Sequence, residues 1–280
     1  MVAQHDVSTQ RAVSGGASQV EASLSALARF GTPDAFVIAR ETSAHASVVD
    51  ELLVTGRPIF VEKPLCTSDV DAQRFANVGE GSVFVMDKWR YHPGVRALRE
   101  IVRSGTLGSL VGMRLRRNQP GTHHQDVESP WTLLPHDLAI VDELLGEVPP
   151  LLDVVGDVLD GWTHGVTARF GTDPWVVVES FGRSPRKERE VLVLGTEGAA
   201  VLDDGYASVV SIHRFANGGE LVLDRTVDAT GELPLLAELR EFVAFVDGGP
   251  PPRAGAASGA RHVRIINEIL NRLRPTGMNS

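Results

Sequence analysis

The 280-residue chain has little cysteine, no long apolar run and no excess of positive charge. Its single cysteine, Cys66, excludes an internal disulfide and fits a reducing compartment. No apolar run is long enough to span a bilayer, and no basic-then-apolar leader opens the chain, so we expect a cytoplasmic protein without a membrane partner. The formal net charge of −9 argues against nucleic acid as a partner, because nucleic acid binds to a cationic face.

The overall composition, 42% apolar and 22% charged, is that of a folded globular protein. The first third of the chain alternates short apolar runs with helix-like stretches, which predicts a parallel, doubly wound sheet. Residues 2–6 could end a strand, and the alanine-rich stretch 19–30 predicts a helix closed by a glycine. Further strands are expected at 35–39, 58–61 and 82–86, and further helices at about 43–53 and 69–77.

The pattern changes near Gly105–Gly108, so we predict two domains, 1–106 and 107–280. From residue 110 onward, most apolar runs alternate with polar residues, as in an antiparallel sheet with one wet face. These runs are 111–117, 165–170, 175–181, 190–195, 199–203, 208–215 and 220–227, and helical stretches cover 133–145, 235–245 and 259–273.

Three short segments carry residues suited to chemistry. Val61–Leu65 places a Glu-Lys pair at the end of an apolar strand, followed by Lys88–Pro93 and then Pro135–Asp137. Ligands of open α/β sheets bind at the carboxyl ends of such strands, although Lys before Pro in a turn is often only solvated. In this order the three segments resemble the Gfo/Idh/MocA family of NAD(P)-dependent oxidoreductases.

That resemblance implies a fold of class α/β plus α+β. An N-terminally truncated Rossmann-like parallel sheet would be followed by a C-terminal domain with a large, mainly antiparallel open sheet. It also implies NAD or NADP as cofactor, a small sugar-like substrate such as a sugar, nucleotide-sugar or cyclitol, and a homo-oligomer, either dimer or tetramer. The predicted C-terminal domain would bind substrate and mediate assembly.

The resemblance assigns proton transfer to Lys63 and His136. A lysine at this strand end can orient a hydroxyl and stabilise an alkoxide. His136 lies at the family's acid/base position, but the family's usual Asp four residues earlier is Thr132 here. We expect substrate contacts from Lys88, Arg90, Tyr91 and Thr132.

Cofactor contacts are expected from Asp6, Ser43, His45, Glu62 and Lys63. Asp6 matches the family's ribose-binding acid, which would repel a 2′-phosphate and so leans towards NAD. The segment before His45 departs from the family pattern, because Arg40 and Glu41 replace a Thr-Pro pair.

The adjacent histidines His123 and His124, with Asp126 nearby, could suggest a metal site. No metal-ligand spacing such as HxxxH accompanies them, so we expect no metal. The loop 118–126 is instead expected to cover the active site and to influence substrate choice.

The sequence contains no G-x-G-x-x-G, the fingerprint that binds a dinucleotide's pyrophosphate. By pattern, the first strand and helix of the Rossmann-like domain are missing, and a truncated product and an evolved loss both remain open. The expected function is therefore an NAD(P)-dependent oxidoreductase. The alternatives are a cofactor-independent lyase, isomerase or cyclase on the same scaffold, and a non-catalytic partner subunit.

Overall fold

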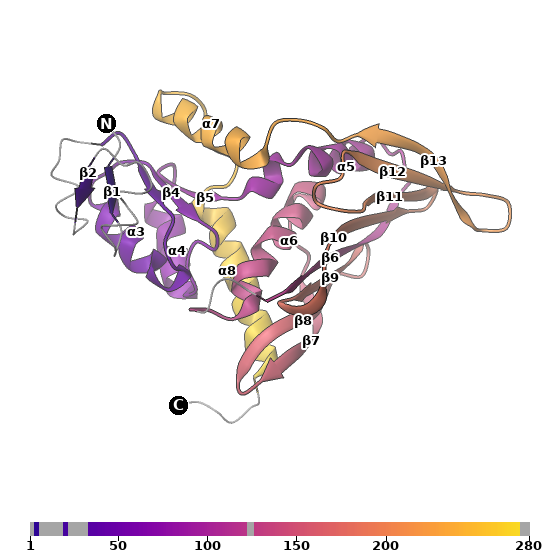
Figure 1. The fold of residues 1–280 in the computed structure, drawn as a ribbon, viewed down its shortest axis with the longest axis horizontal. Coiled ribbons are helices and arrows are strands. Elements are labelled where there is room, and N and C mark those ends of the chain that lie inside the picture. The colour runs from indigo at the N-terminus through magenta and orange to yellow at the C-terminus, as the bar shows by residue number, and fades with distance from the viewer. Residues whose placement is uncertain (1–2, 6–18, 22–32, 122–125, 275–280) are drawn as a thin grey trace.

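The computed structural model describes residues 3–5, 19–21, 33–121 and 126–274, which form three sheets (Figure 1). The smallest sheet pairs β1 (Ala3–His5) with β2 (Gln19–Glu21) in parallel. The prediction of a helix over 19–30 is therefore wrong for its first three residues, because pairing with β1 outweighs the weak helical preference of residues 19–21. The rest of that stretch lies outside the described residues.

The second sheet is the parallel sheet that the alternating pattern predicts. It consists of β3 (Phe36–Ile38), β4 (Ile59–Glu62) and β5 (Val83–Met86), paired in that order. Every residue of β5 is buried, as expected for a parallel strand covered on both faces. Between these strands lie η1 (Thr42–Ala44), α3 (His45–Leu53) and α4 (Asp69–Val78). The hydroxyl of Ser68 caps α4 by accepting a hydrogen bond from the backbone N–H of Asp71 at 3.2 Å.

Two helices from the end of the chain pack on this parallel sheet (Figure 1). In α7 (Pro234–Val246), Phe242 stacks on Phe60 with the ring centroids 4.5 Å apart. Helix α8 (Ala256–Leu273) contacts α4, β5, α6 and β7. Gly259 permits the close approach of α8, since a Cβ there would lie 2.8 Å from the Val85 side chain.

The third sheet has eight strands in the order β13-β12-β11-β10-β6-β9-β8-β7. All its neighbours are antiparallel except β6 and β9, so it is the large, mainly antiparallel sheet that we predict. Helix α6 (Ser129–Leu145) is buried along most of its length and packs on the sheet beside α5 (Pro93–Arg103). The strands are β6 (Leu110–Pro120), β7 (Leu151–Leu159), β8 (Trp162–Phe170), β9 (Trp175–Phe181), β10 (Arg183–Gly195), β11 (Gly198–Leu202), β12 (Val209–Phe215) and β13 (Leu221–Asp228).

A buried ion-pair cluster joins the short helix η2 (Lys88–Tyr91) to α6 and α8. The Arg90 guanidinium donates to the Asp142 carboxylate at 2.8 Å, to the Ser258 hydroxyl at 2.8 Å and to the Asp87 carboxylate at 3.2 Å. A ring nitrogen of His262 lies 3.0 Å from Asp142. Because all these side chains are buried, each charge depends on its partners for the solvation it has lost.

A third buried acid, Glu238 of α7, lies beside this cluster and accepts a hydrogen bond from the backbone N–H of Asp87. Burial, reinforced by the nearby Asp87 charge, raises the pKa of Glu238 to about 9. The folded protein therefore keeps this carboxyl protonated at neutral pH, whereas the unfolded chain ionises it from its ordinary value of 4.5. This difference lowers the free energy of unfolding as the pH rises from about 4.5 towards 9.

We expect Glu238→Gln to stabilise the fold increasingly as the pH rises. Glutamine keeps an oxygen for the Asp87 N–H and cannot ionise, so its effect should be near zero at pH ~5 and about 1–3 kcal/mol at pH ~8. Urea denaturation at both pH values measures the difference. An equal effect at the two pH values would contradict the raised pKa.

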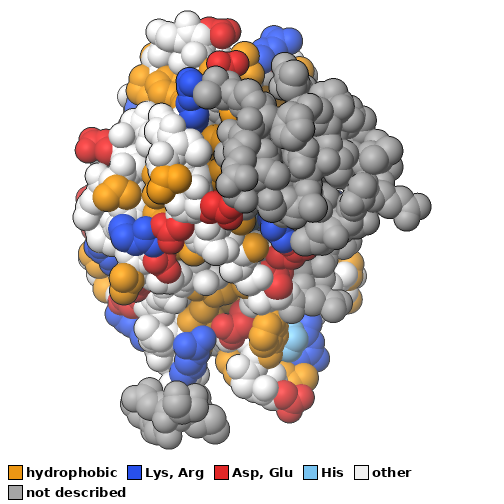
Figure 2. Space-filling view, turned by 90° about the vertical axis from the view of Figure 1, so that its left-hand side faces the viewer, with side chains coloured by type: hydrophobic (Ala, Val, Ile, Leu, Met, Phe, Trp, Pro, Cys, Tyr) orange, Lys and Arg blue, Asp and Glu red, His pale blue; other side chains and the backbone are white. Residues whose placement is uncertain are grey.

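The space-filling view in Figure 2 shows one side of the molecule. On the described part of this side, acidic and basic side chains are interspersed with apolar ones, so neither sign of charge dominates. Within the described ranges, none of the helices is long and apolar enough to cross a membrane.

Candidate active site

A cavity of about 330 Å³ lies where the end of β4 meets η2, β6, α6 and β10. Its size suits a small polar ligand. Most of its polar lining side chains are basic, namely Lys63, Lys88, His92, Arg117, His136 and Arg189. In the described part of the chain, no carboxylate lines it.

Lys63 enters this cavity from the carboxyl end of the parallel sheet. It directly follows β4, and its ammonium group donates a hydrogen bond to the backbone carbonyl of Thr132 in α6 at 2.9 Å. Burial lowers the pKa of Lys63 to about 8, since the influence of Glu62 only partly offsets the loss of solvation. A lysine with this pKa can donate or accept a proton close to neutral pH.

His136 lines the same cavity from α6, one helical turn after Thr132. Its ring lies edge-on to Trp89, with the centroids 6.3 Å apart. Burial, and then the nearby Lys63 and Arg117 charges, hold the pKa of His136 well below its ordinary value of 6.5. The imidazole is therefore neutral at pH 7 and able to accept a proton.

Thr132, which stands where the resembled family has an Asp, makes a contact within its own helix. The Thr132 hydroxyl donates to the Ser129 carbonyl at 2.9 Å, so it stabilises the first turn of α6. The buried Nδ1 atom of His136 has no hydrogen-bond partner among the described residues. Thr132 therefore lines the cavity and accepts the hydrogen bond of Lys63 through its backbone carbonyl.

Arg117 of β6 also lines the cavity. Its guanidinium donates to the Asp137 carboxylate at 2.9 Å and lies 4.5 Å from the centre of the Trp89 ring. Burial raises the pKa of Asp137 to about 6 despite this pairing. The interaction with Trp89 adds cation–π attraction in a site largely shielded from water.

Arg189 and Tyr206 lie in the part of the cavity contributed by β10 and the loop after β11. The Arg189 guanidinium donates to the Tyr206 hydroxyl at 3.1 Å, which lowers the pKa of that phenol. His92 supports the same loop, because one ring nitrogen lies within hydrogen-bond distance of the Gly205 carbonyl while the other accepts the Gly94 N–H that begins α5.

The structure brings Lys63, Lys88, Thr132 and His136, four of the residues expected from the sequence, to this cavity. It places two others elsewhere. Arg90 lies in the buried ion-pair cluster, and the Tyr91 hydroxyl donates to Glu241 on α7.

Among the described residues expected to bind a cofactor, those after Asp6 lie near the carboxyl ends of β3 and β4. His45 is 1% exposed, and its ring nitrogens lie 2.7 Å from the Pro64 carbonyl and 3.1 Å from the Arg40 carbonyl, so it fixes the turn after Lys63. The Ser43 N–H donates to the Asp126 carboxylate at 3.0 Å. Glu62 accepts the backbone N–H of Lys63 at 3.1 Å.

Asp6, His123 and His124 lie outside the described residues. Within the described ranges, His, Cys, Asp and Glu side chains do not gather in threes around a possible metal position.

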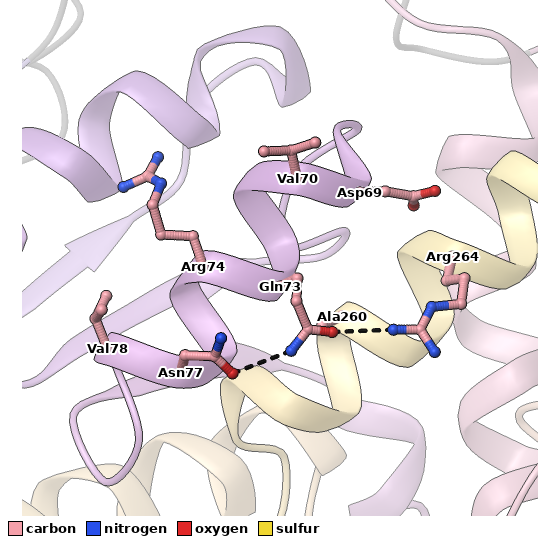
Figure 3. A pocket seen from close by; sticks show the side chains of 8 residues that line it. All are labelled: Asp69, Val70, Gln73, Arg74, Asn77, Val78, Ala260 and Arg264. Atoms are coloured by element: carbon pink, nitrogen blue, oxygen red, sulfur yellow. Dashed lines mark hydrogen bonds between the residues drawn. The ribbon is translucent and has the colours of Figure 1, made fainter.

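Two other hollows differ from the cavity in charge. The groove between α4 and α8 in Figure 3, about 540 Å³, contains Gln73, which accepts from Arg264 at 2.9 Å and donates to Asn77 at 3.1 Å. Its polar groups thus satisfy one another across two helices. A hollow of about 640 Å³ beside α5 mixes bases with acids, namely Arg96, Glu100, Arg225, Asp228 and Glu232.

Comparison with known proteins shows which family the chain resembles. Residues 3–81 match the family model described as an oxidoreductase family with an NAD-binding Rossmann fold. An inositol 2-dehydrogenase from Ralstonia nicotianae is 26% identical over 232 residues, which cover 73% of this chain and 64% of that protein. The amino-terminal part of the chain thus matches the Gfo/Idh/MocA family model, and this curated relative resembles most of the chain. A 2,7-anhydro-N-acetylneuraminate hydratase from Escherichia coli is 23% identical over 207 residues, covering 65% of this chain and 54% of the relative.

Solved structures of this fold resemble the chain over nearly its whole length. A UDP-N-acetylglucosamine 3-dehydrogenase from Acidithiobacillus ferrooxidans superimposes with a TM-score of 0.81 at 18% identity, covering 98% of this chain and 89% of the other. A 3-ketoreductase from Actinomadura kijaniata gives 0.84 at 17% identity, covering 98% and 90%. These likenesses establish the fold, while the chain spans less than two thirds of the length of the two curated relatives above.

The basic residues contributed by the large sheet were missed by the sequence reasoning. Arg117 and Arg189 become neighbours only through strand pairing. One compositional signal was available: among 27 Lys and Arg residues, the chain has only three lysines, Lys63, Lys88 and Lys187. Two of them line this cavity, and the ammonium of the third lies 5.9 Å from the centre of the Tyr206 ring.

Proposed function

We propose that this protein is an NAD(P)-dependent oxidoreductase acting on a hydroxyl or keto group of a sugar, nucleotide-sugar or cyclitol. The observation that supports this most is the meeting of Lys63 and His136 in one cavity at the end of a parallel strand. The pKa of Lys63, about 8, lets it exchange a proton near neutral pH, and the lowered pKa of His136 leaves its imidazole neutral, with a nitrogen free to accept a proton. The relatives named as dehydrogenases of inositol and of a nucleotide-sugar support the substrate class.

The residues of the chain fit one end of a dinucleotide better than the other. Lys63 and Glu62 provide polar groups where the nicotinamide ribose of a Rossmann-like fold would lie. The sequence has no G-x-G-x-x-G to cradle the pyrophosphate through backbone N–H groups. A bound nicotinamide would supply the hydride acceptor or donor.

The chemistry of the chain itself is proton transfer and charge stabilisation. In the oxidation direction, neutral His136 accepts the hydroxyl proton as the alkoxide forms. The Lys63 ammonium donates a hydrogen bond to that oxygen, which lowers the energy of its developing negative charge. The Thr132 carbonyl holds Lys63 in place for this contact. In the reduction direction, the same groups return the proton to the carbonyl oxygen.

A cofactor-independent lyase, isomerase or cyclase is the second candidate. It is favoured by Thr132, which stands where the family resemblance predicts an acidic partner for His136. A relative named as a hydratase shows the range of chemistry among similar sequences. Lys63 and His136 would act as acid and base in this case also.

Calorimetric titration of the 280-residue chain with NADH and with NADPH distinguishes the two candidates. We expect micromolar binding of at least one, with circular dichroism confirming that the sample is folded. A Lys63→Met variant should bind more weakly if Lys63 contacts the nicotinamide ribose. A folded chain that binds neither nucleotide would exclude the redox proposal for this polypeptide and favour the second candidate.

A further inference from the structure

We propose that the cavity binds a substrate carrying a phosphoryl group, and that Lys88, Lys187, Arg189 and Tyr206 hold this group. Calling the bound molecule the substrate rests on the function proposed above. The binding of the anion does not, because it follows from the charges around the cavity.

Strand pairing places two arginines directly opposite each other. Arg117 of β6 and Arg189 of β10 are register partners in the antiparallel ladder, and both line the cavity. Like charges in directly opposed positions destabilise a sheet. Arg117 has Asp137 as a counter-ion, whereas the Arg189 guanidinium donates a hydrogen bond to the neutral Tyr206 hydroxyl.

The opposite face of the same strand serves as an internal comparison. There Arg114 lies 2.9 Å from the Glu190 carboxylate, and Arg116 lies 3.2 Å from that of Glu179. Each of these arginines thus has an acidic partner from a neighbouring strand. The sheet pairs its charges on the face away from the cavity and leaves an excess of positive charge on the cavity side, as a protein does where a ligand supplies the missing anion.

The lysines of the chain reinforce this pattern. Arginine accounts for 24 of the 27 basic residues, yet all three lysines lie at this cavity or at the ring of Tyr206. Lysine binds phosphate as a compact point charge, and arginine binds it through a planar pair of donors. The Tyr206 ring is 77% exposed, and its centre lies 5.9 Å from the Lys187 ammonium and 5.5 Å from the Arg189 guanidinium, so its hydroxyl can serve as a further donor.

The number and spread of these cations favour a phosphoryl group over a carboxylate. One arginine can bind a carboxylate, which carries a single charge, in a bidentate fashion. Here Lys88 comes from η2, while Lys187 and Arg189 come from β10, so three cations approach from two elements. A phosphoryl group brings close to two negative charges and three strong acceptor oxygens. Lys63 and His136 line the same cavity and would contact the part of the substrate that reacts.

Titration with inorganic pyrophosphate and with inorganic phosphate, at constant ionic strength, tests this site without any cofactor or turnover. We expect wild-type chain to bind pyrophosphate and to melt at a higher temperature when it is bound. Lys88→Met and Arg189→Gln should each weaken binding by about 10–100-fold. Arg116→Gln, the matched change on the opposite face, should leave binding unchanged.

The free protein gives a second, independent measurement. Because Arg189 opposes Arg117, Arg189→Gln should leave the melting temperature of the ligand-free chain unchanged or raise it, whereas loss of a structural arginine would lower it. Equal binding by wild type and Arg189→Gln would overturn the proposal, as would glucuronate, a sugar carboxylate, binding as tightly as pyrophosphate.

Failure of this inference is distinguishable from failure of the proposed function. Pyrophosphate binding that depends on Lys88 and Arg189 in a chain that binds neither NADH nor NADPH would support the anion site and refute the redox function. If NADH binds and displaces pyrophosphate, the cations serve the cofactor, and the substrate inference is overturned. If both bind together, the site belongs to the substrate.

Discussion

Replacement of Lys63 by methionine is expected to lower kcat/KM by about 10²–10⁴-fold, the usual contribution of a positioned acid or base. The ammonium group lines the cavity, held by the Thr132 carbonyl, and its pKa of about 8 lets it exchange a proton near neutral pH. Methionine keeps most of the apolar length of the side chain, so the fold should be preserved. Activity is measured from the absorbance of the reduced nicotinamide during oxidation of candidate sugars and cyclitols.

Lys63→Arg separates charge from proton transfer. Arginine keeps the positive charge but does not lose a proton at any usual pH. If Lys63 transfers a proton, the arginine variant should be as impaired as Lys63→Met, and the step in the wild-type pH profile near pH ~8 should disappear. Recovery of most activity in Lys63→Arg would show instead that the charge alone matters. Wild-type activity in Lys63→Met would contradict both roles.

Replacement of Arg90 by methionine is expected to cost about 3–5 kcal/mol of the free energy of unfolding. The guanidinium pairs with two buried carboxylates, Asp87 and Asp142, and donates to Ser258. Its removal leaves those carboxylates with too little compensating charge in a buried site. Urea denaturation at neutral pH measures the loss.

Two further variants show that the effect belongs to the buried cluster. Arg240→Gln removes an exposed arginine 2.8 Å from Glu232 and should cost less than about 1 kcal/mol. The double variant Arg90→Met with Asp142→Asn should recover part of the loss, because one of the unpaired carboxylates is then neutral. A small effect of Arg90→Met would mean that water or His262 compensates these acids.

The parallel strands and most of the large sheet could be predicted because their patterns are local. Strands β4 and β5 can be recognised from their apolar composition and polar borders alone. The run at 175–181 gives β9 with the same bounds, because alternate residues are buried and half-buried along it. The family resemblance added the order of the two kinds of sheet.

Strand β7 and helix α5 were missed for different reasons. Strand β7 has an exposed and irregular pattern, so its residues show no period of two. Helix α5 carries a helical signal, since Val95, Leu98 and Ile101 lie three residues apart after a proline at the helix start. The basic residues between them make this apolar periodicity hard to recognise in the sequence.

Only half of the candidate site could be predicted from the sequence, because only half of it lies in segments with a local pattern. Lys63 and His136 lie in recognisable segments, whereas the opposition of Arg117 and Arg189 depends on the register between strands 72 positions apart in sequence. Arg90 lies two residues from Lys88, yet its side chain reaches α6 and α8 while that of Lys88 reaches the cavity. Sequence gives no rule for which of two neighbouring cations points into a site and which into a buried cluster.

The contacts of α8 bear on the order in which the chain can fold during synthesis. This helix follows every element that it contacts: it packs on α4 and β5 and also on β7, and it supplies Ser258 and His262 to the buried cluster. A nascent chain therefore exposes the apolar surfaces beneath α8 until residues 256–273 have left the ribosome. Chaperone demand should accordingly persist until then, and release of the chain before α8 emerges would yield a product that aggregates.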